Sequence, residues 1–190
     1  MGKIFYIMGK SASGKDRIYS ILSKDESLGL KRLVLYTTRP IRAGEENGRE
    51  YYFTDENRLE EFRKTNRLIE SRAYHTVHGI WTYFTADDGQ INPQGTDYLG
   101  IGTLESYRKM KEYYGEETVC PIYIQVEDGE RLQRALIREK QQENPRYAEM
   151  CRRFLADQEN ILAAGIRIRF ENDDLDNCVR NIIKYIKSVT

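Results

Sequence analysis

The fold class is decided by the stretch Ile4-Phe5-Tyr6-Ile7-Met8-Gly9-Lys10-Ser11-Ala12-Ser13-Gly14-Lys15-Asp16. Its first part, together with Lys3, is an apolar run of strand length. A turn rich in glycine and serine follows, and then Ile18, Ile21 and Leu22 recur at helical spacing. The stretch therefore predicts a strand, a tight loop and a helix in direct succession, which is the start of a βα unit.

The turn matches the pattern G-x-x-x-x-G-K-[ST] at three of its four defined positions. Glycines let backbone amides converge on phosphate oxygens, Lys15 adds a positive charge for the terminal phosphates, and the helix N-terminus adds partial positive charge. All three features favour binding of a polyphosphate. We expect the binding residues to be Gly9, Ser11, Ala12, Ser13, Gly14, Lys15 and Asp16.

Asp16 stands where the pattern has Ser or Thr, whose hydroxyl would contact Mg²⁺. A carboxylate also ligates Mg²⁺ and is favoured at a helix N-terminus, although it adds negative charge beside the phosphates. We therefore predict an altered phosphate loop in which Asp16 is the candidate Mg²⁺ ligand.

Strand patterns alternate with helix patterns along the rest of the chain. The alternation predicts an α/β fold with a mostly parallel sheet, helices on both faces and ligands at the carboxyl ends of the strands. Strands are predicted over 32–36, 97–101, 119–126 and 166–170, and helices over 104–114 and after Asn172. A further helix is predicted with Asp128 as its cap and with Leu132, Ala135 and Leu136 sharing one apolar face. We expect one domain over 1–190, with a core of 1–38, 96–137 and 154–190, an acceptor region of about 39–95 and a helical lid of about 138–153.

Composition narrows the function classes. The 190 residues contain 30 Lys and Arg against 30 Asp and Glu, and 39% are hydrophobic. This balance excludes compositional disorder and argues against a surface that grips nucleic acid, which needs a basic excess. No apolar run is long enough for a membrane span and no signal-peptide pattern occurs, so we expect a cytoplasmic protein without a membrane partner. The odd number of cysteines, widely spaced, suggests neither disulfides nor a zinc site.

A second stretch is more specific: Thr37-Thr38-Arg39-Pro40-Ile41-Arg42-Ala43-Gly44-Glu45-Glu46-Asn47-Gly48-Arg49-Glu50-Tyr51-Tyr52-Phe53. It resembles the guanylate kinase family, whose members carry T-T-R-x-x-R-x-G-E-x-x-G-x-D-Y-x-F after the second core strand. The resemblance covers nearly the whole chain. Its other matches are Leu68-Ile69-Glu70 with the family's F-I-E, Asn172-Asp173-Asp174-Leu175 with its N-D-D-L, and Arg134, Arg138 and Arg153 with its lid arginines.

The resemblance implies a P-loop nucleoside monophosphate kinase that transfers the γ-phosphoryl of ATP to GMP with Mg²⁺. It places adenine near Asn172 and Asp173 and guanine against Glu70. On the residues' own chemistry, Arg39 and Arg42 can fork onto one acceptor phosphate, with Tyr51 donating its hydroxyl. The expected catalytic residues, which would neutralise the transferring group, are Lys15, Arg134, Arg138 and Arg153.

Several positions depart from the family pattern. Two aspartates that end the family's third core strand correspond to Gly100 and Gly102, and a guanine-reading serine corresponds to Leu35. Asp97 or Asp16 are the candidates to replace a missing Mg²⁺ carboxylate. The family's G-N-x-Y-G appears as Gly79-Ile80-Trp81-Thr82-Tyr83, in which Tyr83 is the candidate acceptor contact and Trp81 could equally stack on a base.

Two alternatives stay open at this point. A kinase of another acceptor, such as a phosphorylated ribose, would keep two phosphate sites without base contacts. A catalytically silent binding module would explain the lost aspartates, but it has no physical need for the retained Gly9, Gly14 and Lys15. The expected partners are the small-molecule nucleotides ATP and GMP, and the sequence does not decide between a monomer and a homodimer.

Overall fold

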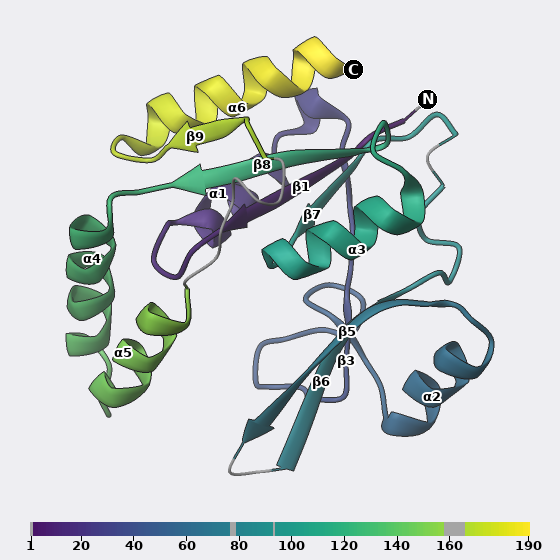
Figure 1. Cartoon of the computed structure of the whole chain (residues 1–190), viewed down its shortest axis with the longest axis horizontal. Coiled ribbons are helices and arrows are strands. Elements are labelled where there is room, and N and C mark those ends of the chain that lie inside the picture. The colour runs from purple at the N-terminus through teal and green to yellow at the C-terminus, as the bar shows by residue number, and fades with distance from the viewer. Residues whose placement is uncertain (1, 77–78, 93, 158–165) are drawn as a thin grey trace.

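The computed structural model describes residues 2–76, 79–92, 94–157 and 166–190. Its larger sheet has five strands in the order β2-β7-β1-β8-β9, all paired in parallel. Their carboxyl ends therefore share one edge (Figure 1). The strands are β1 (Ile4–Gly9), β2 (Lys31–Arg32), β7 (Tyr98–Ile101), β8 (Val119–Gln125) and β9 (Arg169–Glu171).

Helices cover both faces of this sheet, as predicted (Figure 1). Alternate side chains of a strand point to opposite faces, so Ile4, Tyr6 and Met8 pack with α3 (Leu104–Tyr114). Phe5 and Ile7 pack on the other face with α1 (Lys15–Leu22) and α6 (Leu175–Val189). Residues 4–8 are fully buried, which explains why the strand reads as an unbroken apolar run.

A second sheet, in the order β4-β3-β6-β5, accounts for much of the acceptor region. Its core joins Tyr36, Phe62 and Phe84 from β3, α2 and β6. Residues 77–78 and 93 of this region lie outside the described residues, as do 158–165 of the expected core. The elements are β3 (Tyr36–Thr37), β4 (Tyr52–Phe53), α2 (Glu56–Lys64), β5 (Leu68–Thr76) and β6 (Gly79–Ala86).

The predicted strand over 32–36 is wrong as a single element. It divides into β2 in the larger sheet and β3 in the smaller one. Between them, the side-chain amide of Gln90 accepts from the backbone N–H of Val34 at 3.1 Å and donates to its carbonyl at 3.1 Å. A side chain thus satisfies the backbone where the chain passes from one sheet to the other.

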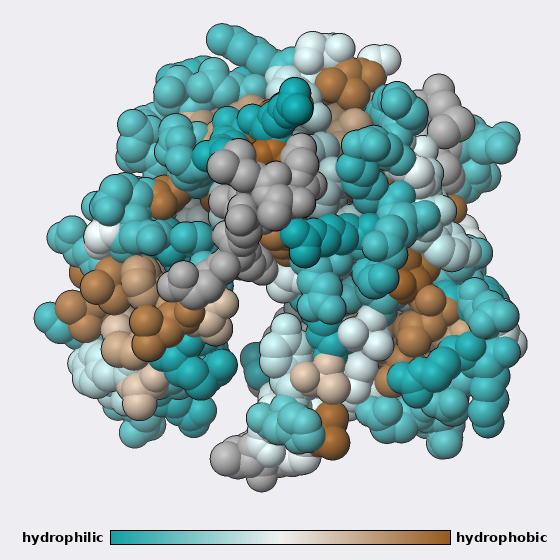
Figure 2. Space-filling view, in the orientation of Figure 1, coloured by the Kyte–Doolittle hydropathy of each residue, from teal (hydrophilic) through white to brown (hydrophobic). Residues whose placement is uncertain are grey.

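Two helices, α4 (Asp128–Lys140) and α5 (Tyr147–Ala156), form a pair beside the carboxyl edge (Figure 1). Asp128 does not cap α4 as predicted, because Glu127 accepts from the Glu130 N–H at 3.0 Å and Asp128 is held by Arg131. Leu132, expected on the core face, is 41% exposed. Figure 2 shows the surface hollowed between this helix pair and the smaller sheet. Among the described residues, no helix has the length and apolarity needed to cross a bilayer.

Candidate active site

The phosphate loop between β1 and α1 depends on its two glycines. A Cβ at Gly9 would lie 2.6 Å from the Ser13 hydroxyl oxygen and 2.8 Å from the Ile124 carbonyl. Gly14 has a φ of +86° and leaves no room for a side chain beside Asn172. Since α1 begins at Lys15, the positive end of its dipole lies directly at the loop.

Lys15 and Asp16 form an exposed ion pair with an Nζ to Oδ2 distance of 3.3 Å. The Asp16 side chain is 85% exposed and that of Lys15 is 24% exposed. Exposed pairs of this kind contribute little free energy, so the pair leaves Lys15 free to bind a phosphate instead.

The side chain of Asn172 hydrogen-bonds to the phosphate loop. Its buried side-chain amide donates to the Ser13 carbonyl at 2.8 Å, and its own carbonyl accepts from Arg134 Nη2 at 2.9 Å. Asp173 is exposed next to it. Arg134 is therefore brought to the loop, whereas contact of Asn172 and Asp173 with adenine stays a prediction.

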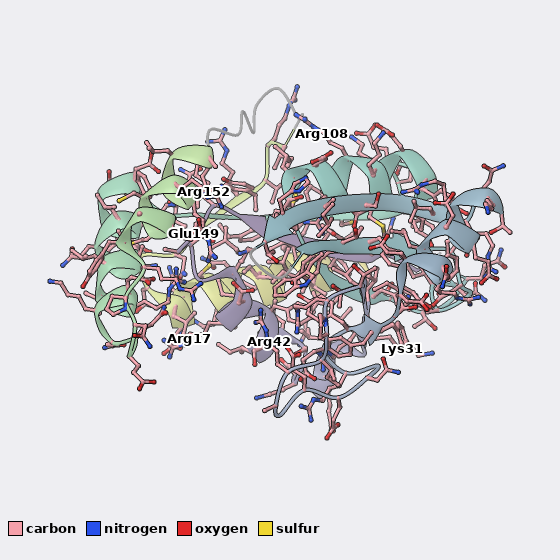
Figure 3. All side chains as sticks on the ribbon, turned by 90° about the horizontal axis from the view of Figure 1, so that it is seen from below. Arg17, Lys31, Arg42, Arg108, Glu149 and Arg152 are labelled. Atoms are coloured by element: carbon pink, nitrogen blue, oxygen red, sulfur yellow. The ribbon has the colours of Figure 1, made fainter. Side chains whose placement is uncertain are left out.

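The other two lid arginines lie further along the helix pair. Arg138 is exposed near the end of α4, and Arg153 on α5 pairs with Glu149 at 2.8 Å. Glu149 also binds Arg152, and these two arginines lower its pKa to about 2. Glu149 and Arg152 are labelled on α5 in Figure 3. The structure thus holds Arg153 on its own helix and not at the phosphate loop.

Arg39 is fixed by its surroundings. It is 3% exposed, and its Nη1 and Nη2 donate to the two carboxylate oxygens of Glu45 at 2.9 and 2.8 Å. Its guanidinium carbon lies 5.5 Å from the Tyr51 ring centroid and 5.3 Å from that of Phe53. The Arg39 guanidinium lowers the pKa of Glu45 to about 2. Such a bidentate pair sets the orientation of Arg39 rather than leaving it mobile.

Arg42 lies 6.0 Å above the Trp81 ring and makes no ion pair with the described residues. The rings of Tyr51 and Tyr83 meet edge to face at 5.5 Å. Burial, then Tyr83, and more weakly the Asp16 carboxylate raise the pKa of Tyr51. In Figure 3 Arg42 lies on the same side of the molecule as Arg17 of α1.

Glu70 is buried on β5 and has two partners that the sequence analysis did not identify. Thr85 donates its hydroxyl to Glu70 Oε1 at 2.9 Å, and Arg72 Nε donates to Oε2 at 3.1 Å. Arg72 Nη1 also lies 3.4 Å from the Thr103 hydroxyl. The two-residue spacing of Glu70 and Arg72 in a strand was a usable signal, because such residues share a face.

Tyr6 explains the absence of carboxylates at the end of β7. A Cβ at Gly100 would lie 2.8 Å from Tyr6 Cδ2, and one at Gly102 would overlap the Tyr6 hydroxyl. The phenol is buried and its hydroxyl has no hydrogen-bond partner among the described residues. Asp97 cannot replace the carboxylates as suggested, because it precedes β7 at the opposite edge and accepts from the Lys3 N–H at 2.6 Å.

A phosphate loop that joins the central strand of a parallel sheet to a helix defines a P-loop protein of the α/β class. The particular family follows from comparison with known proteins. A model of the guanylate kinase family matches residues 1–189, and the chain belongs to this family.

Individual relatives agree with this assignment. Guanylate kinase of Porphyromonas gingivalis is 30% identical over 188 residues, which cover 98% of this chain and 97% of the relative. Guanylate kinase of Coxiella burnetii is 26% identical over 187 residues, covering 97% and 86% of the two chains. The crystal structure of guanylate kinase from Anaplasma phagocytophilum has the same fold, with a TM-score of 0.65 at 18% identity over 98% of this chain and 85% of that one.

Proposed function

We propose that this protein is a nucleoside monophosphate kinase that transfers the γ-phosphoryl of ATP to GMP, giving ADP and GDP. One observation carries the proposal: the chain has both a phosphate loop with Lys15 and a second cluster suited to phosphate. In that cluster Arg42 makes no ion pair with the described residues and lies on the same side of the molecule as Arg17 of α1 (Figure 3). Two neighbouring phosphate sites are what transfer of a phosphoryl group between two nucleotides requires.

The proposed roles follow from each residue's position. The loop amides and Lys15 hold the β- and γ-phosphates of ATP. Arg39, Arg42, Tyr51 and Tyr83 hold the acceptor phosphate, and Glu45 orients Arg39 for this role. Closure of the lid (about 138–153) toward the acceptor region (about 39–95) excludes water. The arginines that then neutralise the transferring group are Arg134, Arg138 and Arg153.

Mg²⁺ fits this site through Asp16. Mg²⁺ keeps several waters and typically takes one or two carboxylates together with substrate phosphates, so a single exposed aspartate at the loop is sufficient protein ligation. No group of three or more His, Cys, Asp or Glu side chains that could hold a metal ion occurs within the described ranges. When bound, the ion supplies charge neutralisation at the β- and γ-phosphate oxygens.

Glu70 is the proposed base-recognition residue. Its carboxylate can accept hydrogen bonds from N1–H and the exocyclic amine of guanine, whereas adenine has no N1–H and presents a different edge. Each oxygen of Glu70 has one described partner, Thr85 or Arg72, and each retains a second lone pair.

An acceptor screen tests the proposal. ADP formation from ATP and Mg²⁺ is measured by a coupled assay against GMP, dGMP, AMP, UMP, CMP and ribose phosphates, with Lys15→Ala and Arg42→Ala as comparison variants. We expect turnover with GMP and a loss of about 100-fold or more in each variant, because each removes charge stabilisation of the transfer. Turnover with another acceptor alone would reassign the substrate, and no turnover would favour a binding module.

A further inference from the structure

Arg131 of α4 is a charged residue buried to 1% exposure. Its Nε donates to the Ser11 carbonyl at 2.9 Å, and its Nη2 donates to Asp157 Oδ2 at 2.7 Å. Its Nη1 donates to Asp128 Oδ1 at 2.5 Å, and its guanidinium carbon lies 4.8 Å from the Phe154 ring centroid. All three guanidinium nitrogens are therefore engaged.

Asp157 hydrogen-bonds both to the phosphate loop and to Arg131. Its Oδ2 accepts from the Ser11 N–H at 2.6 Å as well as from Arg131. Both polar backbone groups of Ser11 are thus held, the N–H by Asp157 and the carbonyl by Arg131. The next residue, Ala12, has a φ of +61°, which is uncommon for a residue other than glycine. The two hydrogen bonds to Ser11 therefore lie directly beside the left-handed residue of the loop.

Arg131 and Asp157 come from the ends of the two lid helices that lie next to the phosphate loop. Arg131 lies in the first turns of α4, one turn before Arg134, and Asp157 directly follows the last residue of α5. The lid arginines Arg138 and Arg153 lie further along the same helices. When the helix ends next to the loop are hydrogen-bonded to it, the far ends of the two helices can move while the near ends keep their position relative to the loop.

Packing alone does not require this network. An apolar side chain at position 131 would fill the space against Phe154 without the desolvation of a guanidinium, and buried ion pairs often add no net stability over such replacements. What three directed charge-assisted hydrogen bonds add is a defined geometry. The network therefore specifies where Ser11 lies.

We propose that Arg131 and Asp157 are positioning residues for ATP: together they hold the phosphate loop at Ser11 in its phosphate-binding conformation and fasten the lid helices to it. The inference rests on the ATP site of the proposed function and is independent of which acceptor is used.

Calorimetric binding of a non-hydrolysable ATP analogue and of GMP, each with Mg²⁺, tests this inference. Arg131→Met and Asp157→Asn should each weaken binding of the analogue about 10- to 100-fold, the usual effect of losing a charge-assisted hydrogen bond. Binding of GMP should change less than about 2-fold, since its residues lie elsewhere. A parallel loss for both ligands, or no loss for the analogue, would overturn the proposal.

The chain offers a matched control in Arg58 of α2. Like Arg131, it pairs with a carboxylate three residues away, at 2.6 Å, and lies over a phenylalanine ring, at 4.5 Å. Its side chain is 42% exposed, however, and it is distant in sequence from the loop. Arg58→Met should bind both ligands as the parent does. The double variant Arg131→Met/Asp157→Asn should lose little more than the weaker-binding single variant, because the two residues act as one unit.

Amide hydrogen exchange provides a second readout should Arg131→Met fold poorly. In Asp157→Asn, the Ser11 amide should exchange faster by about 10-fold or more, while amides of β8 keep their protection. Unchanged protection at Ser11 would contradict the proposal that Asp157 restrains this residue. If the parent binds the ATP analogue but fails to phosphorylate GMP, the acceptor assignment fails and the present inference stands or falls on the analogue alone.

Discussion

Tyr6 and Gly102 determine each other although they lie on different strands. The Tyr6 phenol fills the space at the end of β7, so residue 102 is restricted to glycine despite an ordinary backbone conformation. An aspartate introduced at position 102 alone would therefore clash with the buried Tyr6 phenol, whatever charge it added to the site. The loss of the carboxylates is thus a coordinated rearrangement involving Tyr6.

Gly102→Ala tests this coupling. The added Cβ would overlap the Tyr6 hydroxyl and lie 3.0 Å from Cζ, so we expect the variant to lose about 1–3 kcal/mol of unfolding free energy. In a Tyr6→Phe background the loss should be smaller, because the hydroxyl is absent. Urea unfolding of the four proteins gives the coupling energy. An equal loss in both backgrounds would mean that Tyr6 does not restrict position 102.

At the scale of elements, the loop between β3 and β4 is closed by the Arg39 and Glu45 pair. The Glu45 carboxylate has a folded-state pKa of about 2, below its ordinary value near 4.5, chiefly because it accepts hydrogen bonds from Arg39. A lowered folded pKa means that the pair stabilises the fold above about pH 4.5 and loses this contribution as pH falls toward 2. The acid side of the stability profile therefore reports on this loop.

Thermal unfolding of Glu45→Gln checks this expectation. The variant should melt below the parent above pH 5. The difference should shrink as pH falls below about 4.5 and vanish only well below pH 2, where Glu45 is protonated in both the folded and the unfolded protein. Lys109→Gln, which removes an exposed ion pair on α3, serves as the control with little expected change. A difference that is constant across this pH range would contradict the assigned pKa.

The elements also show what the sequence can predict. The strand, loop and helix around residues 4–22 follow from local periodicity and glycine placement, and the structure confirms them. The division of 32–36 into two strands depends on the Gln90 side chain, more than fifty residues away, which no local pattern reports. Arg131 reads as a surface charge on an amphipathic helix, and only tertiary structure joins it to Asp157.

The same limit applies to the candidate site. Arg39, Arg42, Tyr51 and the phosphate loop lie in two continuous stretches and were assigned from them, whereas their roles as ligands stay predictions. Tyr6 looks like an ordinary core residue of β1 in the sequence. Its effect on the site appears only when β1 and β7 are placed side by side.

At the scale of the whole molecule, a hollow separates the α4 and α5 pair from the smaller sheet (Figure 2). Phosphoryl transfer without loss to water requires this helix pair and the smaller sheet to approach when both nucleotides are bound. Cys151 on α5 is exposed, while Cys120 and Cys178 are buried, so α5 already carries an accessible labelling position.

Pulsed electron resonance between labels on Cys151 and on Glu60→Cys of α2 measures this closure. The distance should shorten by several ångströms when the ATP analogue, Mg²⁺ and GMP are all present, and less with either nucleotide alone. A label pair on Cys151 and Gln133→Cys, within the helix pair, should show no comparable change. The same α5 to α2 distance with and without nucleotides would contradict a closing lid.

The proposed function requires that one phosphoryl group pass from the nucleotide at the phosphate loop to the nucleotide at the second phosphate site. A single-turnover reaction with γ-labelled ATP, Mg²⁺ and GMP, followed by chromatographic separation of products, follows this group. We expect the label to appear in GDP, and we expect Lys15→Ala to suppress this transfer about 100-fold or more. Label that stays in ATP, or that leaves as inorganic phosphate, would contradict the proposed function.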